Sequence, residues 1–454
     1  MLRRRLREGL WTGSGRSSVR AALRAGLCAA ALVGVAAPAL AQMEMDIADG
    51  IEDDLNPTEL GLALVARDAC NAGGNLEEFQ AQCEALAGAS DEDQELAIGQ
   101  LSPEQLAAQG STGTKLSGGQ MRQISGGLVG RLSALRAGPV AALEIQWRGD
   151  KARYGLREAL ATGAAGEDGG PTFGVYLNGT YGTGDVNNTS KLLGFNYDAG
   201  GLTVGGDVTF EMFAVGAAFS WLRAEADYKS NAGDVESDSF NGSFYGTFFP
   251  IEGLYLDGIV TFGGTEYDTK RKIRYSVPGA TVVTNAKGDP DGEQFAVSGG
   301  VGYDVALGGL TLTPYFRAAY ARIEIDGYSE NGGAGWALRY DSQNIDSVTT
   351  TLGSEVAYAF SLPFGVLVPQ LRGEWIHEYE DDDRRIGSIF TGDTSTQGKF
   401  KIVTDSPDRD YFTLGAETAM TFARGVGAFA AYEVLLGYED VESHRLTFGG
   451  RLEF

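Results

Sequence analysis

From about residue 172 to the end of the chain, apolar and polar residues alternate in segments separated by stretches rich in Gly, Asn and Asp. In the closing segment, 447–454, apolar residues take alternate positions and the last of them is Phe454. Successive side chains of a strand point to opposite faces, so this period predicts strands with one apolar and one polar face. A barrel in lipid with a wet interior gives this pattern, and a soluble β-sandwich with its apolar face inward gives the same period.

The connections between the segments distinguish these two folds. Five are short: 210–212, 250–253, 307–309, 362–365 and 424–427. Six others are mostly long and polar: 182–199, 227–236, 268–292, 326–345, 379–409 and 438–442. Alternating short and long connections are typical of outer-membrane barrels, which have tight turns at one end and long loops at the other. We therefore predict an all-β fold, a 12-stranded antiparallel transmembrane β-barrel over 166–454, with a small helical amino-terminal region.

The first 41 residues have the pattern of a secretory signal peptide. Seven Arg precede an apolar run, 27–37, that is too short to span a bilayer, and Ala39-Leu40-Ala41 provides a cleavage site before Gln42. Removing 1–41 takes away seven Arg and one Glu and leaves 29 basic and 60 acidic residues, a net charge of −31. Such acidity argues against nucleic-acid binding.

Residues 42–165 differ in composition, being rich in Ala, Leu, Glu and Gln and poor in aromatic residues. Apolar residues recur there at spacings of three and four: Met121, Ile124, Leu128, Leu132 and Leu135. This spacing predicts an amphipathic helix over 116–137. The stretch 115–143 contains four basic residues and no acidic one: Lys115, Arg122, Arg131 and Arg136.

Two cysteines, Cys70 and Cys83, follow the predicted signal peptide. In an exported chain a disulfide is the default interpretation of such a pair. We predict that Cys70 and Cys83 are joined.

The polar faces of the predicted strands carry charges of both signs. Alternation places five of them in the lumen: Arg372, Glu374, Glu417, Glu433 and Arg451. A basic helix thinned by glycines could plug such a partly acidic lumen. The alternative is that 116–137 packs against its helical neighbours in a small soluble domain, and the sequence leaves both open.

Candidate chemistry is sparse. A serine-esterase block of the Gly-Asp-Ser-Leu type is absent, and only His377 and His444 follow the predicted signal peptide. His377 precedes the acidic cluster 381–383, which we interpret as a solvated loop. The sequence therefore predicts no catalytic, cofactor-binding or metal-binding residues and a chain that is not an enzyme.

The closing segment resembles the β-signal by which outer-membrane barrels are recognised, with Thr447, Gly449, Leu452 and Phe454 in its pattern. Residues from about 172 to 454 resemble the 12-stranded translocator domain of the autotransporter (type V secretion) family. The resemblance lies in four stretches and the closing strand: 174–179, 365–370, 405–412 and Tyr432-Glu433.

The resemblance implies the outer membrane of a Gram-negative bacterium and a helix that threads the pore. The implied partners are outer-membrane lipid and lipopolysaccharide, the barrel-assembly machinery and periplasmic chaperones, with a monomeric chain. Residues 42–165 depart from the family, because they are short and show no 20–50-residue repeat of a β-helical passenger.

Two hypotheses follow. In the first, the chain inserts in the outer membrane and translocates, displays or anchors its own short amino-terminal segment. In the second, it is a stand-alone pore or structural barrel whose helical domain stays in the periplasm.

Overall fold

The structure is a computed structural model that describes residues 57–71, 77–101, 122, 124–135, 171–189, 191–278, 280–391, 399–422 and 425–454. The predicted signal peptide, 1–41, lies outside the described residues, as do Lys115 and Arg136 of the predicted basic helix.

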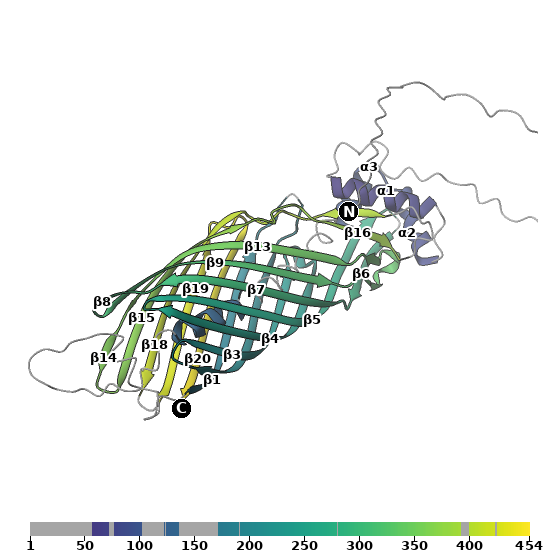
Figure 1. Cartoon of the computed structure of the whole chain (residues 1–454). Coiled ribbons are helices and arrows are strands. Elements are labelled where there is room, and N and C mark those ends of the chain that lie inside the picture. Colours follow the sequence, from purple (N-terminus) through teal and green to yellow (C-terminus); the bar gives the residue numbers. More distant parts are fainter. Residues whose placement is uncertain are drawn as a thin grey trace, which may run out of the picture. The chain divides into compact units, whose positions relative to one another are not determined.

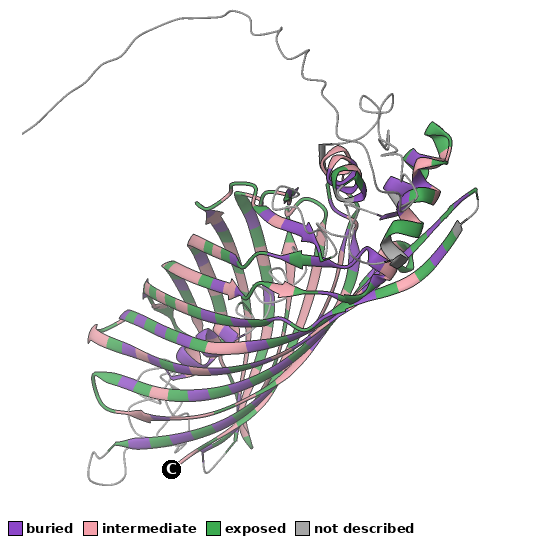
Figure 2. Cartoon of the chain, turned by 90° about the vertical axis from the view of Figure 1, so that its right-hand side faces the viewer, coloured by how far each residue is buried: buried purple, intermediate pink, exposed green. Residues whose placement is uncertain are grey.

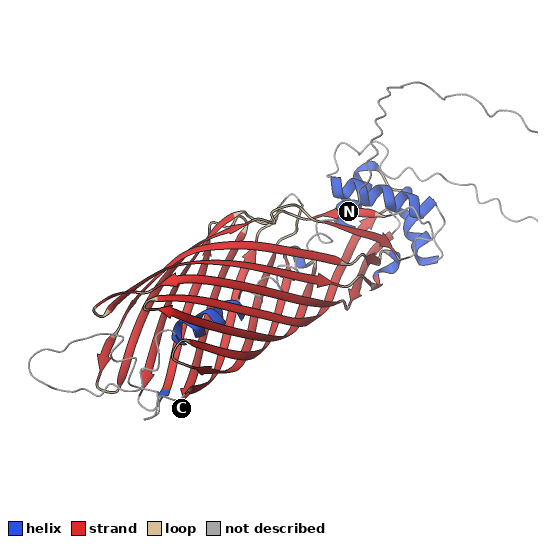
Figure 3. Ribbon diagram, viewed as in Figure 1, coloured by secondary structure: helices blue, strands red, loops and turns tan. Residues whose placement is uncertain are grey.

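Twelve long strands of the described residues form a closed antiparallel barrel (Figures 1 and 3). They are β1 (Thr172–Val186), β2 (Phe195–Thr209), β3 (Phe213–Tyr228), β4 (Gly233–Ile251), β5 (Leu254–Val277), β7 (Asp291–Tyr303), β9 (Leu310–Ile325), β13 (Gln343–Tyr358), β15 (Gly365–Glu378), β18 (Asp410–Phe422), β19 (Val426–Leu436) and β20 (Val441–Glu453). Each pairs with the next, and β20 pairs with β1 from Gly174↔Glu453 to Val186↔Val441. The predicted fold is confirmed.

Exposure alternates along each strand, as the sequence period requires (Figure 2). On β20, Phe448 and Leu452 are exposed on the outer face, while Arg451 lies half-buried on the inner face. Burying large apolar side chains in water-free lipid explains why so many point outward. The apolar face therefore surrounds the barrel, which excludes the sandwich alternative.

The two ends of the barrel differ. Four described turns with few residues lie at the end that holds Phe454: 210–212, 252–253, 308–309 and 363–364. Two short strands, β8 (Val305–Leu307) and β14 (Phe360–Leu362), pair beside the last two of these turns. We call this end the short-turn end and the opposite one the long-loop end.

At the long-loop end, stretches predicted as polar loops contain strands. They are β6 (Ala280–Gly288), β10 (Tyr328–Ser329), β11 (Asn331–Gly332), β12 (Leu338–Tyr340), β16 (Arg385–Phe390) and β17 (Phe400–Val403), with the 3-10 turns η1 (Lys229–Asn231) and η2 (Gly333–Gly335). The loop interpretation of 268–292 was wrong, because β5 continues to Val277 and forms a hairpin with β6. Buried Ile273, Tyr275 and Val277 alternate there with polar residues, so a second apolar core extends the strand.

Three helices supply the rest of that core: α1 (Pro57–Asn71), α2 (Glu77–Ala87) and α3 (Asp91–Leu101). Leu62, Leu86 and Ile98 are buried in one cluster with side chains of the long-loop end, among them Trp336 and Ile402. At the start of α3, Ser90 Oγ accepts a hydrogen bond from the Asp93 amide (3.2 Å), which is an N-cap. None of the helices that the structure describes is both long and apolar enough to cross a membrane.

The predicted disulfide is confirmed, since Cys70 of α1 is bonded to Cys83 of α2. Closing a loop of this size removes about 3 kcal/mol of unfolded-chain entropy. We expect Cys70→Ser to make helices α1–α3 much more sensitive to added protease, with the barrel unchanged on a heat-modifiability gel. Wild-type protein treated with a reductant is the control, and equal protease resistance in all three samples would contradict this prediction.

Candidate functional site in the barrel lumen

A helix spanning 124–135 lies inside the barrel (Figure 3). Its apolar stripe is buried: Ile124, Leu128, Val129, Leu132 and Leu135. The stripe packs against side chains of β1 and β3–β5: Tyr176, Ala214, Ala218, Leu222, Tyr245 and Ile259. We call 124–135 the lumen helix. It falls within the range predicted as helical, and its apolar stripe fixes which side of the lumen it contacts.

Arg131 joins the lumen helix to the wall through a buried ion pair with Asp207 of β2. Its Nε donates to Oδ2 at 2.7 Å and its Nη2 to Oδ1 at 2.6 Å. The two side chains are only 4% and 1% exposed. Tyr245 Oη also donates to Asp207 Oδ2 (3.0 Å), and Arg131 Nη1 lies 3.4 Å from Glu453 Oε1. A bidentate pair of this kind fixes both the distance and the orientation of the lumen helix relative to β2.

The wall formed by β13, β15 and β18–β20 is charged. Arg372 Nη2 donates to Glu433 Oε2 (2.8 Å), and Arg445 donates to the other oxygen of Glu433. Glu374 accepts hydrogen bonds from Tyr315 Oη and Thr413 Oγ1, both at 2.6 Å. The structure thus brings Arg372, Glu374 and Glu433 into one network of the lumen.

Arg451 and Glu417 also lie on the lumen side. Arg451 donates to Thr421 Oγ1 (3.3 Å), and its Nε is 3.5 Å from Glu453 Oε1. Glu417 lines a cavity beside the lumen helix. Arg122 is exposed and lies just before the described helical run, so its role stays a prediction.

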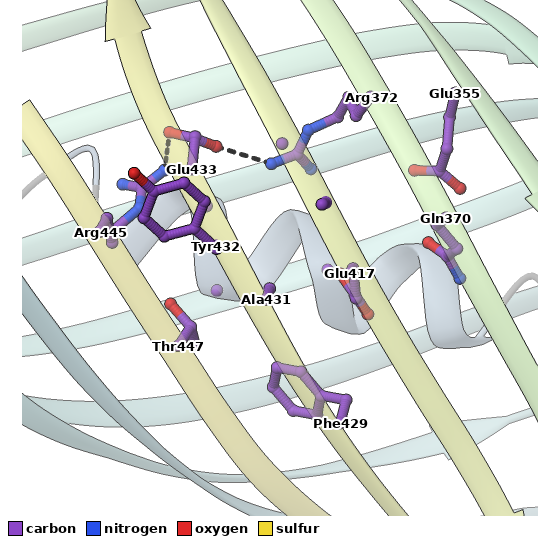
Figure 4. Close-up of a pocket in the computed structure, with 15 residues that line it drawn as sticks. Glu355, Gln370, Arg372, Glu417, Phe429, Ala431, Tyr432, Glu433, Arg445 and Thr447 are labelled. Carbon is purple, nitrogen blue, oxygen red and sulfur yellow. Dashed lines mark hydrogen bonds and ion pairs between the residues drawn. The ribbon is translucent and has the colours of Figure 1, made fainter.

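The cavity lies between the lumen helix and the charged wall (Figure 4). Gly126, Gly127 and Gly130 turn toward it, opposite residues of β13, β15 and β18–β20 that include Glu355, Gln370, Arg372, Glu417, Glu433 and Thr447. A Cβ at Gly127 or Gly130 would meet no atom within 4 Å. The lumen helix therefore packs against the barrel wall with its apolar face, and its glycine face borders a cavity lined by polar residues.

The wall formed by β4, β5 and β7 is mostly neutral, although the buried Asp257 of β5 lies on its inner face. Ser239 is hydrogen-bonded to Thr265 (2.6 Å), and Ser243 to Thr261 (2.8 Å). Most charged side chains of the described lumen therefore lie on the opposite wall and at the Arg131–Asp207 pair.

The predicted β-signal residues divide between the two faces. Thr447 lines the lumen cavity, whereas the Leu452 and Phe454 side chains are exposed on the outside. Phe454 and Phe173 of β1 exchange two backbone hydrogen bonds of 2.9 Å, and their rings stack 6.4 Å apart. The last residue therefore closes the seam between β20 and β1.

Gly449 fills a position where no side chain fits. A Cβ there would lie 2.3 Å from Asn178 Oδ1, 2.6 Å from the Phe429 ring and 2.8 Å from the Leu177 carbonyl oxygen. We expect Gly449→Ala to lower the free energy of unfolding by about 1–3 kcal/mol through overpacking at the seam. Gly450→Ala is the control, because its nearest atom would be 3.6 Å away. Equal urea midpoints for the two variants would contradict this.

His377 does not join the acidic cluster next to it in the sequence. Its Nδ1 lies 2.8 Å from Asp410 Oδ1, and Trp375 Nε1 donates to the same oxygen at 2.9 Å. Asp381 instead forms an ion pair with Arg409 (2.6 Å).

Sequence reasoning missed Asp207, Glu453, Glu355 and Arg445 as lumen residues. Alternation along β2, β13 and β20 places all four on an inner face, so that signal was present for each of them. Their interaction partners could not be predicted from the sequence, because partners such as Arg131 and Asp207 are 76 residues apart.

The family model for the autotransporter β-domain matches residues 175–433, more than half of the chain. The chain belongs to this family. It is therefore an outer-membrane translocator barrel of a Gram-negative bacterium, as predicted, and its assembly involves the outer-membrane biogenesis machinery.

Curated relatives cover less of the chain. It is 32% identical over 187 residues to Esterase EstA of Pseudomonas aeruginosa, which is 40% of this chain and 28% of the relative. It is 31% identical over 194 residues to an uncharacterized protein in the trpE-trpG intergenic region of Pseudomonas putida, 42% of this chain and 31% of the relative. The chain thus spans under a third of the length of these relatives.

Two solved structures are similar in fold. The translocator domain of the autotransporter NalP from Neisseria meningitidis is 17% identical, with a TM-score of 0.49, and the match covers 63% of this chain and 90% of that one. The β-domain of the Bordetella autotransporter BrkA is 16% identical, with a TM-score of 0.44, over 62% and 99% of the two chains.

The prediction that the chain is not an enzyme is contradicted by the comparison with EstA, because that relative and its Pseudomonas putida counterpart are esterases by name. The prediction rested on missing motifs in one sequence. A missing motif carries less weight than sequence similarity to a protein named as an esterase.

Proposed function

We propose that the chain translocates its own amino-terminal segment, keeps helices α1–α3 docked at the cell surface and closes the pore with the lumen helix. The path of the chain through the barrel carries this proposal. Gly126 lies beside Arg445, whereas Arg131 and Leu135 lie beside Thr172 and Glu453 at the short-turn end. The lumen helix thus points its carboxyl end toward the start of β1.

Barrel orientation converts this path into a direction across the membrane. Outer-membrane barrels place short turns in the periplasm and long loops outside the cell. The short-turn end then faces the periplasm, and α1–α3 lie at the extracellular end. A chain that is outside at α3 and periplasmic at β1 has crossed the barrel, which is what self-translocation leaves behind.

Contacts at the long-loop end support retention of the displayed helices. Tyr275 Oη donates to Gln82 Oε1 of α2 (2.8 Å), and Phe400 of β17 contacts α1 near Gly61. Below this interface Arg271 and Glu330 form a buried bidentate pair, with contacts of 3.0 and 2.6 Å. Burial and this nearby carboxylate raise the pKa of Tyr340 well above its usual range. An interface with its own apolar core favours permanent docking over release.

The remaining assignments follow from this scheme. Residues 1–41 direct export and are removed, 42–165 form the passenger and linker with a pore helix inside 116–137, and 166–454 form the barrel. The monomer contacts outer-membrane lipid through its apolar band and lipopolysaccharide above that band, and periplasmic chaperones deliver it to the assembly machinery. Thr447, Gly449, Leu452 and Phe454 act as the β-signal.

Cysteine labelling of intact cells tests the direction of crossing. Leu96 of α3 is 56% exposed and Ile251 at a short turn is 63% exposed. We expect an impermeant maleimide to label Leu96→Cys on intact cells and Ile251→Cys only after permeabilisation. Labelling of Leu96→Cys only after permeabilisation would instead support a barrel with a periplasmic helical domain.

The EstA relatives favour a second candidate function, ester hydrolysis at the cell surface. Intact cells that express the full chain are assayed with p-nitrophenyl butyrate against cells with an empty vector. Hydrolysis above the control supports this candidate, and equal rates exclude it for this substrate.

A further inference from the structure

The hairpin of β5 and β6 carries a compact basic surface in a strongly acidic chain. Buried Arg271, Ile273 and Tyr275 face the core of the long-loop end, so residues between them face outward. The outward cations are Lys270, Lys272, Arg274 and Lys287, which we call the hairpin cations. Three of the seven lysines of 171–454 lie here, although the chain has a net charge of −25.

The strand register places these cations close together. Lys270 lies directly opposite Lys287, and Arg274 lies opposite Val283. Directly opposed residues have Cβ atoms about 5 Å apart, and like charges in that position repel. The repulsion between Lys270 and Lys287 is weakest where an anion binds between or beside them.

The protein itself neutralises only part of this charge. Lys270 Nζ lies 3.4 Å from Asp234 Oδ1, and Lys272 donates to the Asn231 side chain. Asp268 and Asp289 lie at the membrane-side base of the hairpin, next in sequence to its paired residues Thr269 and Gly288. Within the described residues, Arg274 and Lys287 have no ion pair, and both are exposed. Two cations are therefore available to a ligand from outside.

The height of the hairpin above the lipid indicates which anion it meets. The outward apolar residues of β4 and β5 end at Phe240 and Phe262, and carboxylates follow on both strands. Lys270 is eight residues beyond Phe262, about 26 Å along the strand. With a tilt of about 40°, that is about 20 Å above the apolar band. This is the level of the sugar core of lipopolysaccharide and is beyond its acyl chains.

We propose that the hairpin cations bind phosphate groups on the inner-core oligosaccharide of lipopolysaccharide. Arg and Lys are the side chains that recognise phosphate, Arg with two parallel donors and Lys as a point charge. The carboxylates of β4 and β5 between the apolar band and the hairpin, Glu236, Asp238, Glu266 and Asp268, repel the same anions. The phosphates are therefore held at the level of the hairpin. This inference rests on the proposed orientation, in which the long-loop end faces the cell exterior.

Binding by purified full-length protein in detergent tests the proposal. The probe is deacylated lipopolysaccharide oligosaccharide with its inner-core phosphates, compared with the same oligosaccharide after phosphate removal. Each cation near an anionic surface contributes about fivefold in affinity, so Arg274→Gln with Lys287→Gln should weaken binding about 25-fold. The control pair is Lys399→Gln with Lys401→Gln, outside the core on the β17 side. The affinity of the wild-type protein for the oligosaccharide, measured at increasing salt concentration, gives a second test that needs no variant.

A 25-fold loss confined to the hairpin pair, together with weakening by salt, supports the site. Three results would overturn it: no binding by wild type, equal binding of the phosphate-free oligosaccharide, or equal loss in the control pair. Tighter binding of an acidic peptide than of the oligosaccharide would also overturn it by assigning the surface to a protein partner. Because this assay uses purified protein, its result does not depend on the cell-labelling result.

Discussion

Replacing Arg131 by Gln is expected to destabilise the plugged barrel by about 3–5 kcal/mol, because Asp207 then remains buried without its cation. Among the described residues Asp207 then keeps only the hydrogen bond from Tyr245, and its side chain is 1% exposed. Asp207→Leu alone should cost less, because Arg131 keeps Glu453 as a carboxylate partner 3.4 Å away. The measurement is the free energy of urea unfolding in detergent, as a double-mutant cycle.

Two further variants make this prediction specific. Arg131→Met combined with Asp207→Leu should recover most of the loss, since replacing both ions by apolar groups removes the desolvation cost. Arg223→Gln is the matched control, because its pairs with Asp238 and Glu236 are exposed and worth about 0–1 kcal/mol. If Arg131→Gln behaves like Arg223→Gln, the pair does not hold the helix in the lumen.

Replacing Trp336 by Ala is expected to release helices α1–α3 from the long-loop end. Trp336 is fully buried, its ring centroid is 5.4 Å from that of Phe390, and its Nε1 donates to Tyr275 Oη at 2.9 Å. Removing such a side chain costs about 3–5 kcal/mol, and Tyr275 also loses the donor that orients its contact to α2. Protease added to intact cells should then digest α1–α3 while the barrel persists.

The control for this prediction is Trp221→Ala, since Trp221 is an exposed side chain on the outer face of β3. It should leave the protease pattern of α1–α3 unchanged. Undiminished protection in Trp336→Ala would mean that the helices are held by something other than the core of the long-loop end.

Sequence alternation predicted the barrel well because it reports a local property. Arg372, Glu374 and Glu433 were placed on the inner face from their neighbours alone, and the short turns followed from the breaks between alternating segments. Cys70 and Cys83 were paired because no other cysteine follows the predicted signal peptide. Each inference required only a few adjacent residues and the chemistry of one environment.

Partners across the lumen could not be predicted in the same way. Alternation gives the face of Asp207 but carries no information about Arg131, which comes from a different secondary structure 76 residues away. The stretch 268–292 was misread for a related reason. It was read as one of the long polar connections, whereas Ile273, Tyr275 and Val277 face a core to which distant helices contribute.

Single-channel conductance in planar bilayers tests most directly the claim that the chain closes its own pore. The full-length protein is compared with a variant that lacks residues 122–135 and is checked for an intact barrel by heat modifiability. The account predicts a low conductance for the full chain and a severalfold larger one for the variant. A full chain that conducts as well as the variant would contradict the account.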